Sequence, residues 1–171
     1  MAPSAAGIVV RPIEFRDIPG FREAVGAVAA ERRWLARTSM FSMEQTAVFV
    51  AGNIAHAHPQ FVADDGGRVV GWCDVFPVPR EVSPHVGVLG MGVLRDYRGR
   101  GIGRRLIAAA LAAAEGRFEQ VDLDVYGNNV AAQALYRSVG FVEQGRKRGG
   151  RKLDGAYDDI LLMTRFLKEP T

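Results

Sequence analysis

Residues 98–105 combine three glycines with four arginines near the middle of the chain. An apolar-periodic segment over 102–114 follows directly. Glycine lets the backbone adopt conformations that a Cβ forbids and lets a ligand approach closely. A helix that begins here points its first N–H groups and the positive end of its dipole at the glycine turn. The stretch therefore predicts a binding site for phosphate groups, and its basic residues are Arg98, Arg100, Arg104 and Arg105.

The spacing of the glycines narrows the kind of phosphate site. A Walker loop has Lys and then Ser or Thr directly after its last glycine, but two arginines follow the last glycine here. A dinucleotide-binding fingerprint has its third glycine three positions after the second, where this chain again has an arginine. The pattern that remains is Arg98-x-x-Gly101-x-Gly103, after an apolar strand that ends at Val93.

A second pattern lies downstream, after one predicted helix and one predicted strand. Residues 129–141 read Asn-Val-Ala-Ala-Gln-Ala-Leu-Tyr-Arg-Ser-Val-Gly-Phe. Together, the two patterns resemble the acyl-CoA loop and the second signature of the GNAT superfamily of acetyl-CoA-dependent N-acetyltransferases. The resemblance covers the C-terminal half of the chain's core, whereas the N-terminal third matches only in the order of its elements.

The resemblance implies an α+β fold, in which one domain has a curved, mostly antiparallel sheet, a splayed central strand pair and helices on both faces. It also implies that acetyl-CoA is the acyl donor and that no metal is needed. Glycine weakens a strand, so the presence of Gly90 and Gly92 in a predicted strand requires an explanation. Close approach of the donor is one reason, and a strand that passes under a packed helix is the alternative. The implied cofactor-binding residues are Met91, Gly92, Val93, Arg98, Gly99, Arg100, Gly101, Ile102, Gly103, Arg104, Asn129 and Tyr136.

Acetyl transfer from a thioester requires a group that returns a proton to the leaving thiolate. Asn129 and Tyr136 are seven residues apart, so on a helix their directions differ by only about 20° and they lie about 10.5 Å apart. The opposite stripe, which includes Ala131, Ala134 and Leu135, is predicted to face the core. By resemblance, Asn129 contacts the cofactor and Tyr136 is the general acid, and a tyrosine that only packs in the core is the alternative.

The general base and the acceptor stay open. His85 has a pKa range suited to proton transfer near neutral pH, and many family members use a chain of waters instead of one base. The resemblance places the acceptor against the first two helices and the last two strands, where carboxylates would suit a cationic amine or simply be solvated. The other candidate bases are Asp74, Glu81, Asp122 and Asp124, and the residues expected near the acceptor are Trp34, Phe41, Glu44, Tyr157, Asp158 and Asp159.

Length, charge and cysteine content narrow the class of protein. The chain has 171 residues and a net charge of +3, which fits one globular domain. It has no basic run interleaved with aromatic residues, so no nucleic-acid partner is expected. It also has no membrane-spanning apolar run and no secretory signal, so we predict a cytoplasmic enzyme. The single cysteine, Cys73, lies in an apolar strand pattern and is predicted to be a buried thiol.

The elements that position these residues follow from periodicity and turn signals. A disordered tail is predicted over 1–7 and the acetyltransferase domain over 8–168. Ser42 is expected to cap the second helix, and Gly140 is expected to end the last one. Helices are predicted over 17–36, 42–55, 102–114 and 129–139, and strands over 8–13, 61–63, 68–76, 85–93, 120–126, 141–146 and 157–166.

Three functions are compatible with these patterns. The first is an enzyme that acetylates a primary amine on a small molecule. The second is an enzyme that acetylates a protein N-terminus or a lysine, and the third is a sensor that binds acyl-CoA without turnover. Tyr136 favours an enzyme, because a pure binding module needs no acid at that place. The resemblance also allows a homodimer, although no interface can be identified in the sequence.

Overall fold

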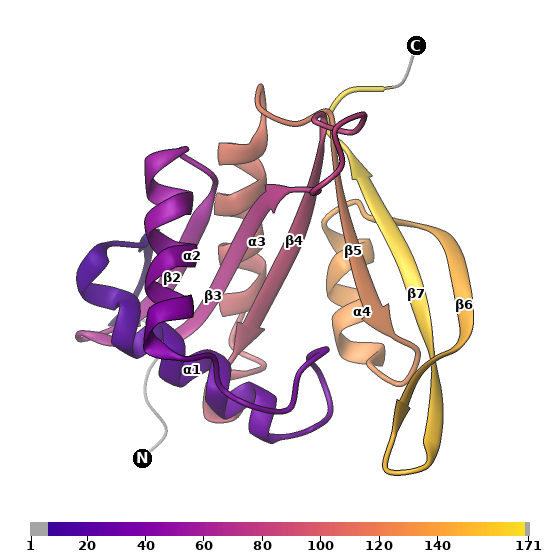
Figure 1. The fold of residues 1–171 in the computed structure, drawn as a ribbon, viewed down its shortest axis with the longest axis horizontal. Coiled ribbons are helices and arrows are strands. Elements are labelled where there is room, and N and C mark those ends of the chain that lie inside the picture. The colour runs from indigo at the N-terminus through magenta and orange to yellow at the C-terminus, as the bar shows by residue number, and fades with distance from the viewer. Residues whose placement is uncertain (1–6, 170–171) are drawn as a thin grey trace. The chain divides into compact units, whose positions relative to one another are not determined.

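The computed structural model describes residues 7–169, so the predicted tail lies, except for Gly7, outside the described residues. Over this range, seven strands form hydrogen-bonded neighbours in the order β1-β2-β3-β4-β5-β7-β6, with four α-helices between them (Figure 1). This confirms the predicted α+β class. The strands are β1 (Ile8–Pro12), β2 (Gln60–Asp65), β3 (Arg68–Pro77), β4 (Val86–Val93), β5 (Gln120–Tyr126), β6 (Val142–Leu153) and β7 (Ala156–Phe166), and the helices are α1 (Ile18–Ala30), α2 (Met43–Ala55), α3 (Ile102–Ala114) and α4 (Val130–Ser138), with 3-10 turns η2 (Phe15–Asp17) and η3 (Arg95–Tyr97).

The chain divides into two compact parts, which are described one at a time. The first part contains the residues up to Phe76 together with Gly90–Ala114, and the second contains Pro77–Leu89 and the residues from Glu115 onward. Strand β4 contributes to both parts. Its first half pairs with β5, and its second half belongs with β1, β2, β3 and helices α1–α3.

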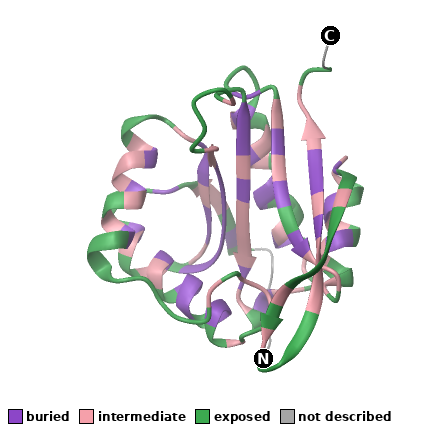
Figure 2. Ribbon diagram, turned by 45° about the vertical axis from the view of Figure 1, so that its right-hand side comes forward, coloured by how far each residue is buried: buried purple, intermediate pink, exposed green. Residues whose placement is uncertain are grey.

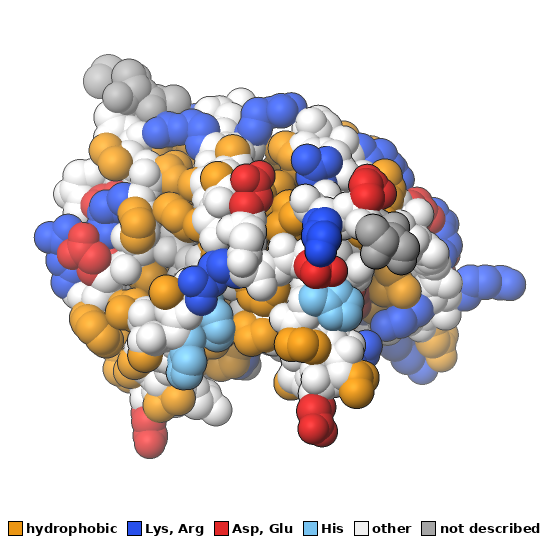
Figure 3. Space-filling model, turned by 90° about the horizontal axis from the view of Figure 1, so that it is seen from above, with side chains coloured by type: hydrophobic (Ala, Val, Ile, Leu, Met, Phe, Trp, Pro, Cys, Tyr) orange, Lys and Arg blue, Asp and Glu red, His pale blue; other side chains and the backbone are white. Residues whose placement is uncertain are grey.

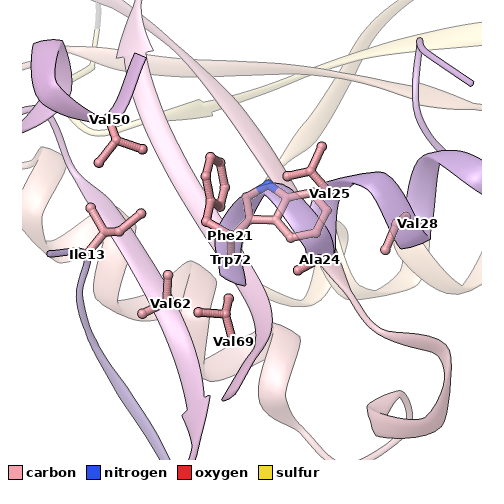
Figure 4. Close-up of a cluster of buried hydrophobic side chains, with 9 residues drawn as sticks. All are labelled: Ile13, Phe21, Ala24, Val25, Val28, Val50, Val62, Val69 and Trp72. Atoms are coloured by element: carbon pink, nitrogen blue, oxygen red, sulfur yellow. The ribbon is translucent and has the colours of Figure 1, made fainter. Parts of the chain in front are cut away.

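In the first part, helices cover both faces of the strands. A buried cluster joins α1 and α2 to one face of β2 and β3 (Figure 4). Within it, the rings of Phe21 and Trp72 pack edge to face, with their centroids 6.0 Å apart. Neighbouring strand residues point to opposite faces. A Cβ built on Gly71 would accordingly meet Leu106 of α3 at 3.2 Å, on the other face. The other members of the buried cluster are Ile13, Ala24, Val25, Val28, Val50, Val62 and Val69.

The ends of α1 and α2 are set by local signals of different strength. Ser42 caps α2 as predicted, since its side chain accepts a hydrogen bond from the Gln45 N–H at 3.1 Å while the Gln45 side chain accepts one from the Ser42 N–H at 3.0 Å. Helix α1 was expected to reach residue 36 but ends at Ala30. Its chain turns away at Arg32, whose φ of 53° lies in the left-handed region.

In the second part, β5 and β7 pair antiparallel over the whole length of β5. Strand β6 pairs with β7 on its other side and is longer than the predicted strand over 141–146, because it continues to Leu153. This ladder shifts register twice, once near Glu143 and once between Lys147 and Arg151. Most residues of β6 are exposed (Figure 2). The parallel ladder of β4 and β5 is short and joins Val86–Val88 to residues 120–122.

Further findings bear on the class of protein. Within residues 7–169, no helix has both the length and the apolarity to cross a bilayer. Cys73 is fully buried, as predicted, and burial raises the pKa of its thiol well above the usual range. On the face seen in Figure 3, basic side chains are spread out with acidic side chains between them. A cytoplasmic location stays a prediction.

Candidate active site

The glycine turn between η3 and α3 adopts a backbone that only glycine takes without strain. Gly99 has a φ of 74° and Gly101 a φ of 75°, both in the left-handed region. A Cβ at either position would meet no atom within 4 Å. The space beside the turn is therefore open, and larger side chains there would project into it.

Helix α3 begins directly after this turn and presents its first backbone N–H groups there. Arg105 donates the first N–H of the helical ladder, to the Gly101 carbonyl at 3.1 Å. The N–H groups of Ile102 and Gly103 come before that ladder, and the first N–H groups of an α-helix have no acceptor within the helix. The Ile102 side chain is only 1% exposed, so this residue can face a ligand only through its backbone. The turn and the helix start together fit a pyrophosphate group.

Arginines around the turn donate side-chain hydrogen bonds within the protein itself, and Arg100 donates one to the Asp96 carbonyl. Arg98 donates from Nε to the Val93 carbonyl at 2.8 Å and from both terminal nitrogens to the carboxylate of Glu31. Arg105 donates to the Ile8 carbonyl at 2.8 Å. In addition, the Arg100 guanidinium lies 5.3 Å from the centre of the Tyr97 ring.

Packing within the protein explains why β4 contains glycine at positions 90 and 92. A Cβ on Gly92 would overlap the Trp72 ring, and a Cβ on Gly90 would lie 2.8 Å from Oδ1 of Asp74. Both glycines therefore make room for side chains of β3, which was not foreseen from the sequence. The predicted contact of Met91, Gly92 and Val93 with the acyl donor stays a prediction, since the packing of β3 already accounts for the glycines.

Asp74 is the candidate base with the most unusual surroundings. Its side chain is buried, at 4% exposure, and it accepts a hydrogen bond from the Gly90 N–H. Burial raises the pKa of Asp74 to about 7, and the Gly90 bond opposes this only in part. Gln60, its cross-strand partner, is also buried, and the Nε2 of Gln60 has no hydrogen-bond partner among the described residues.

The other candidate bases differ from Asp74 in their exposure. His85 and Glu81 are exposed in the segment before β4. Asp124 is exposed on β5, whereas Asp122 is half-buried and accepts a hydrogen bond from the Thr164 hydroxyl at 2.7 Å. Among these five residues only Asp74 is buried.

The second signature forms α4 and its flanks, and one prediction about it was wrong. Asn129 caps α4, because its Oδ1 accepts the Ala132 N–H at 3.2 Å. The covered face of α4 carries Tyr136, at 8% exposure, whereas Ala131 and Ala134 are exposed although they were expected to face the core. Small alanine side chains have little apolar surface to bury, so other contacts decide the orientation of the helix.

Two side chains on the covered face show what orients α4. Gln133 donates from Nε2 to the carbonyls of Tyr126 at 3.0 Å and Gly127 at 2.9 Å, which ties the helix to the end of β5. The Tyr136 ring lies 5.8 Å from the ring of Phe141. Gly140, with a φ of 91°, ends the helical segment as predicted.

Comparison with known proteins decides the family. Residues 28–141 match the family model described as the Acetyltransferase (GNAT) family. The chain is a GNAT acetyltransferase. The matched range contains the glycine turn, β4 and the second signature through Phe141. This membership confirms the expected acyl donor, acetyl-CoA, and the expected enzyme class, an acetyl-CoA-dependent N-acetyltransferase.

Individual relatives support this assignment. The acetyltransferase is 39% identical over 119 residues to the N-alpha-acetyltransferase RimI of Mycobacterium tuberculosis, a match that covers 69% of this chain and 73% of the relative. A ribosomal-protein-alanine N-acetyltransferase from Brucella melitensis superposes with a TM-score of 0.85 at 26% identity, over 92% of this chain and 99% of that one. The protein yncA from Salmonella typhimurium, solved with its cofactor acetyl-CoA, has a TM-score of 0.89 at 16% identity over 96% of each chain, which shows the shared fold.

The residues that were expected near the acceptor differ from one another in exposure and in hydrogen bonding. Trp34 donates its indole N–H to Glu31 at 2.9 Å, and Phe41 and Glu44 are exposed. Asp158 and Asp159 line a shallow depression of about 650 Å³ in the second part of the chain. The Oδ2 atom of Asp158 is buried there without a hydrogen-bond partner in the described structure. The other residues that line the depression are Gly127, Arg146, Arg148, Gly149 and Tyr157.

One contact beside the glycine turn was not foreseen from the sequence. Glu31 binds Arg98 although the two residues are 67 positions apart. Nothing in the local pattern of residues 28–36 singles out this carboxylate. The described part of the chain contains no group of three or more His, Cys, Asp or Glu side chains that could hold a metal ion.

Proposed function

We propose that residues 8–168 acetylate the α-amino group at the N-terminus of a protein, with acetyl-CoA as the donor. The observation that carries this proposal is the 39% identity with an N-alpha-acetyltransferase over most of both chains. The similarity to a ribosomal-protein-alanine N-acetyltransferase supports the same class of acceptor. A protein N-terminus therefore takes precedence over a small-molecule amine and over a sensor without turnover.

In this proposal, backbone groups of the glycine turn hold the donor. Acetyl-CoA supplies the acetyl group, and the thiolate of CoA is the leaving group. The N–H groups from Gly99 to Arg104 bind the pyrophosphate oxygens, which the open space at Gly99 and Gly101 permits. The backbone of residues 91–93 binds the pantetheine arm and donates to the carbonyl oxygen as charge develops on it.

Tyr136 is the proposed general acid, and Asn129 a proposed contact of the donor. As the amine nitrogen bonds to the acetyl carbon and the carbon–sulfur bond breaks, the Tyr136 hydroxyl gives its proton to the sulfur. The amine loses a proton to a base or to water, and Tyr136 regains one from the solvent, so protons balance over the cycle. The Tyr136 side chain is largely buried, where a hydroxyl is partly shielded from competing water.

Replacing Tyr136 by phenylalanine should separate binding from transfer. The ring and its contact with Phe141 are kept, while the transferable proton is removed. We expect kcat to fall roughly a hundredfold and the basic limb of the pH–rate profile to change, with the Kd for acetyl-CoA within twofold of the parent. Unchanged transfer would show that Tyr136 is a packing residue only.

Thermal unfolding with and without acetyl-CoA is the first test of the proposed function. A ligand present at a hundredfold excess over its Kd adds about 2.7 kcal/mol to the free energy of unfolding, which corresponds to a rise in Tm of roughly 5–10 °C for a chain of this size. ATP and NAD should give no such rise. Peptides with free N-termini should then be acetylated faster than free small amines, and the opposite ranking would replace the proposed acceptor.

A further inference from the structure

The carboxylate of Glu31 lies where three segments of the first part meet. Its Oε1 accepts a hydrogen bond from Nη2 of Arg98 at 2.6 Å, and its Oε2 accepts from Nη1 of Arg98 at 2.9 Å. The same Oε2 accepts the indole N–H of Trp34 at 2.9 Å. One side chain thus joins the end of α1 to the glycine turn and to the segment that follows α1.

The position of Glu31 in α1 is unfavourable by itself. Glu31 is the residue that ends the helix, where the negative end of the helix dipole repels a carboxylate. The Arg98 guanidinium offsets this repulsion and is the main reason why the pKa of Glu31 is held below its usual value. The pair is also partly shielded from water, with side chains 18% and 32% exposed. An acidic residue at this helix end is therefore explained by its partner and not by the helix.

Arg98 connects Glu31 to the glycine turn. Its Nε donates to the carbonyl of Val93 at 2.8 Å, so all three guanidinium nitrogens have acceptors on the protein. Val93 is the last residue of β4, and Gly99 follows Arg98 directly. The Arg98 side chain hence fixes the start of the glycine turn against both β4 and the end of α1.

We propose that Glu31 is a positioning residue for acetyl-CoA, which acts through Arg98 to hold the glycine turn in its binding conformation. A two-pronged, charge-assisted contact fixes both the distance and the orientation of a guanidinium. A turn that is ordered before the ligand arrives loses less freedom on binding. The inference rests on the proposed function, because it assumes that the turn binds the donor.

The test compares Glu31→Gln with the parent by calorimetric titration of the folded protein with acetyl-CoA. Glutamine keeps one acceptor oxygen. It loses the negative charge and the two-oxygen contact (the fork) with the Arg98 guanidinium. We expect the Kd for acetyl-CoA to rise about tenfold. In steady-state assays the KM for acetyl-CoA should rise similarly while kcat at saturation stays within twofold. A role limited to stability would lower the active fraction, and hence kcat, and leave this KM unchanged.

Two further variants make the outcome specific. Glu119→Gln removes an exposed carboxylate that pairs with Lys168 at 3.3 Å, and it should leave the Kd unchanged. Arg98→Lys keeps the charge but cannot form the fork, so it should weaken binding as Glu31→Gln does, and the double variant should be no worse than either single one. Additive losses, or a Glu31→Gln protein that binds like the Glu119→Gln control, would overturn the inference.

These results also separate the inference from the proposed function. If the parent protein does not bind acetyl-CoA, the proposed function fails before Glu31 is considered. If the parent binds and only the Glu31 expectation fails, the donor site stands and the positioning role is withdrawn. Should Glu31→Gln not fold, Arg98→Lys alone carries the same expectation, and unchanged binding in that variant overturns it.

Discussion

We expect the replacement of Gly101 by glutamate to weaken acetyl-CoA binding severely while the protein stays folded. The open space beside Gly101 admits the longer side chain, which then lies where the pyrophosphate is expected. A carboxylate about 4 Å from a phosphate charge is repelled by about 4 kcal/mol at an effective dielectric constant of 20, which weakens binding roughly a thousandfold. Titration of the variant with acetyl-CoA measures this loss directly.

Gly116 provides a matched control for this variant. It follows the other end of α3, has a φ of 77° against 75° at Gly101, and has equally open space around its Cβ position. Both glutamate variants therefore carry a similar backbone strain of about 1 kcal/mol, and both should lose a few degrees of Tm. Only Gly101→Glu should lose acetyl-CoA binding, and equal losses in both variants would refute the turn as the pyrophosphate site.

Replacing Asp74 by asparagine should make the protein more stable at pH 8 and leave its stability at pH 4 nearly unchanged. Between its ordinary pKa of 3.8 and its native pKa of about 7, Asp74 keeps in the folded state a proton that the unfolded chain has released. The folded state binds more protons in this window, so stability falls as the pH rises from 4 to 7 and then levels off. This loss is on the order of 4 kcal/mol.

Asparagine removes the titration and keeps an acceptor for the Gly90 N–H. Urea unfolding of both proteins between pH 4 and pH 8 gives the difference in the free energy of unfolding, which should grow through pH 7 in favour of the variant. Asp124→Asn, at an exposed position of β5, should instead follow the parent at every pH. Parallel curves for the parent and Asp74→Asn would show that Asp74 does not titrate in this range.

The sequence predicted most accurately those elements whose pattern is periodic and uninterrupted. The bounds of α3 and β5 agree with the prediction residue for residue, because a clear apolar face and flanking glycines mark both. Helix α1 was predicted to extend six residues beyond its observed end at Ala30, since nothing in the alanine-rich run before Arg32 signals its left-handed turn. Strand β6 was cut short at 146, because two glycines within it, Gly149 and Gly150, indicate a turn and not a bulged ladder.

Within the candidate site, backbone features were easier to foresee than side-chain partners. The glycine turn and the start of α3 follow from local spacing, and the structure has both in the predicted place. By contrast, the partners of Arg98 and the neighbour of Gly92 are set by tertiary packing. Trp72 fills the space over Gly92, and Glu31 comes from a helix far away in the sequence. A single sequence contains no record of such pairs.

The exposed, irregular strand β6 has a consequence for the protein at high concentration. It is the last strand in the pairing order, so one row of its backbone groups is open to a strand from another molecule. Its two register shifts and its run of cations make such an addition unfavourable, because the edge is bent and a second copy would bring like charges together. We therefore expect this edge to resist fibrous aggregation in concentrated solution. The basic residues of β6 are Arg146, Lys147, Arg148, Arg151 and Lys152.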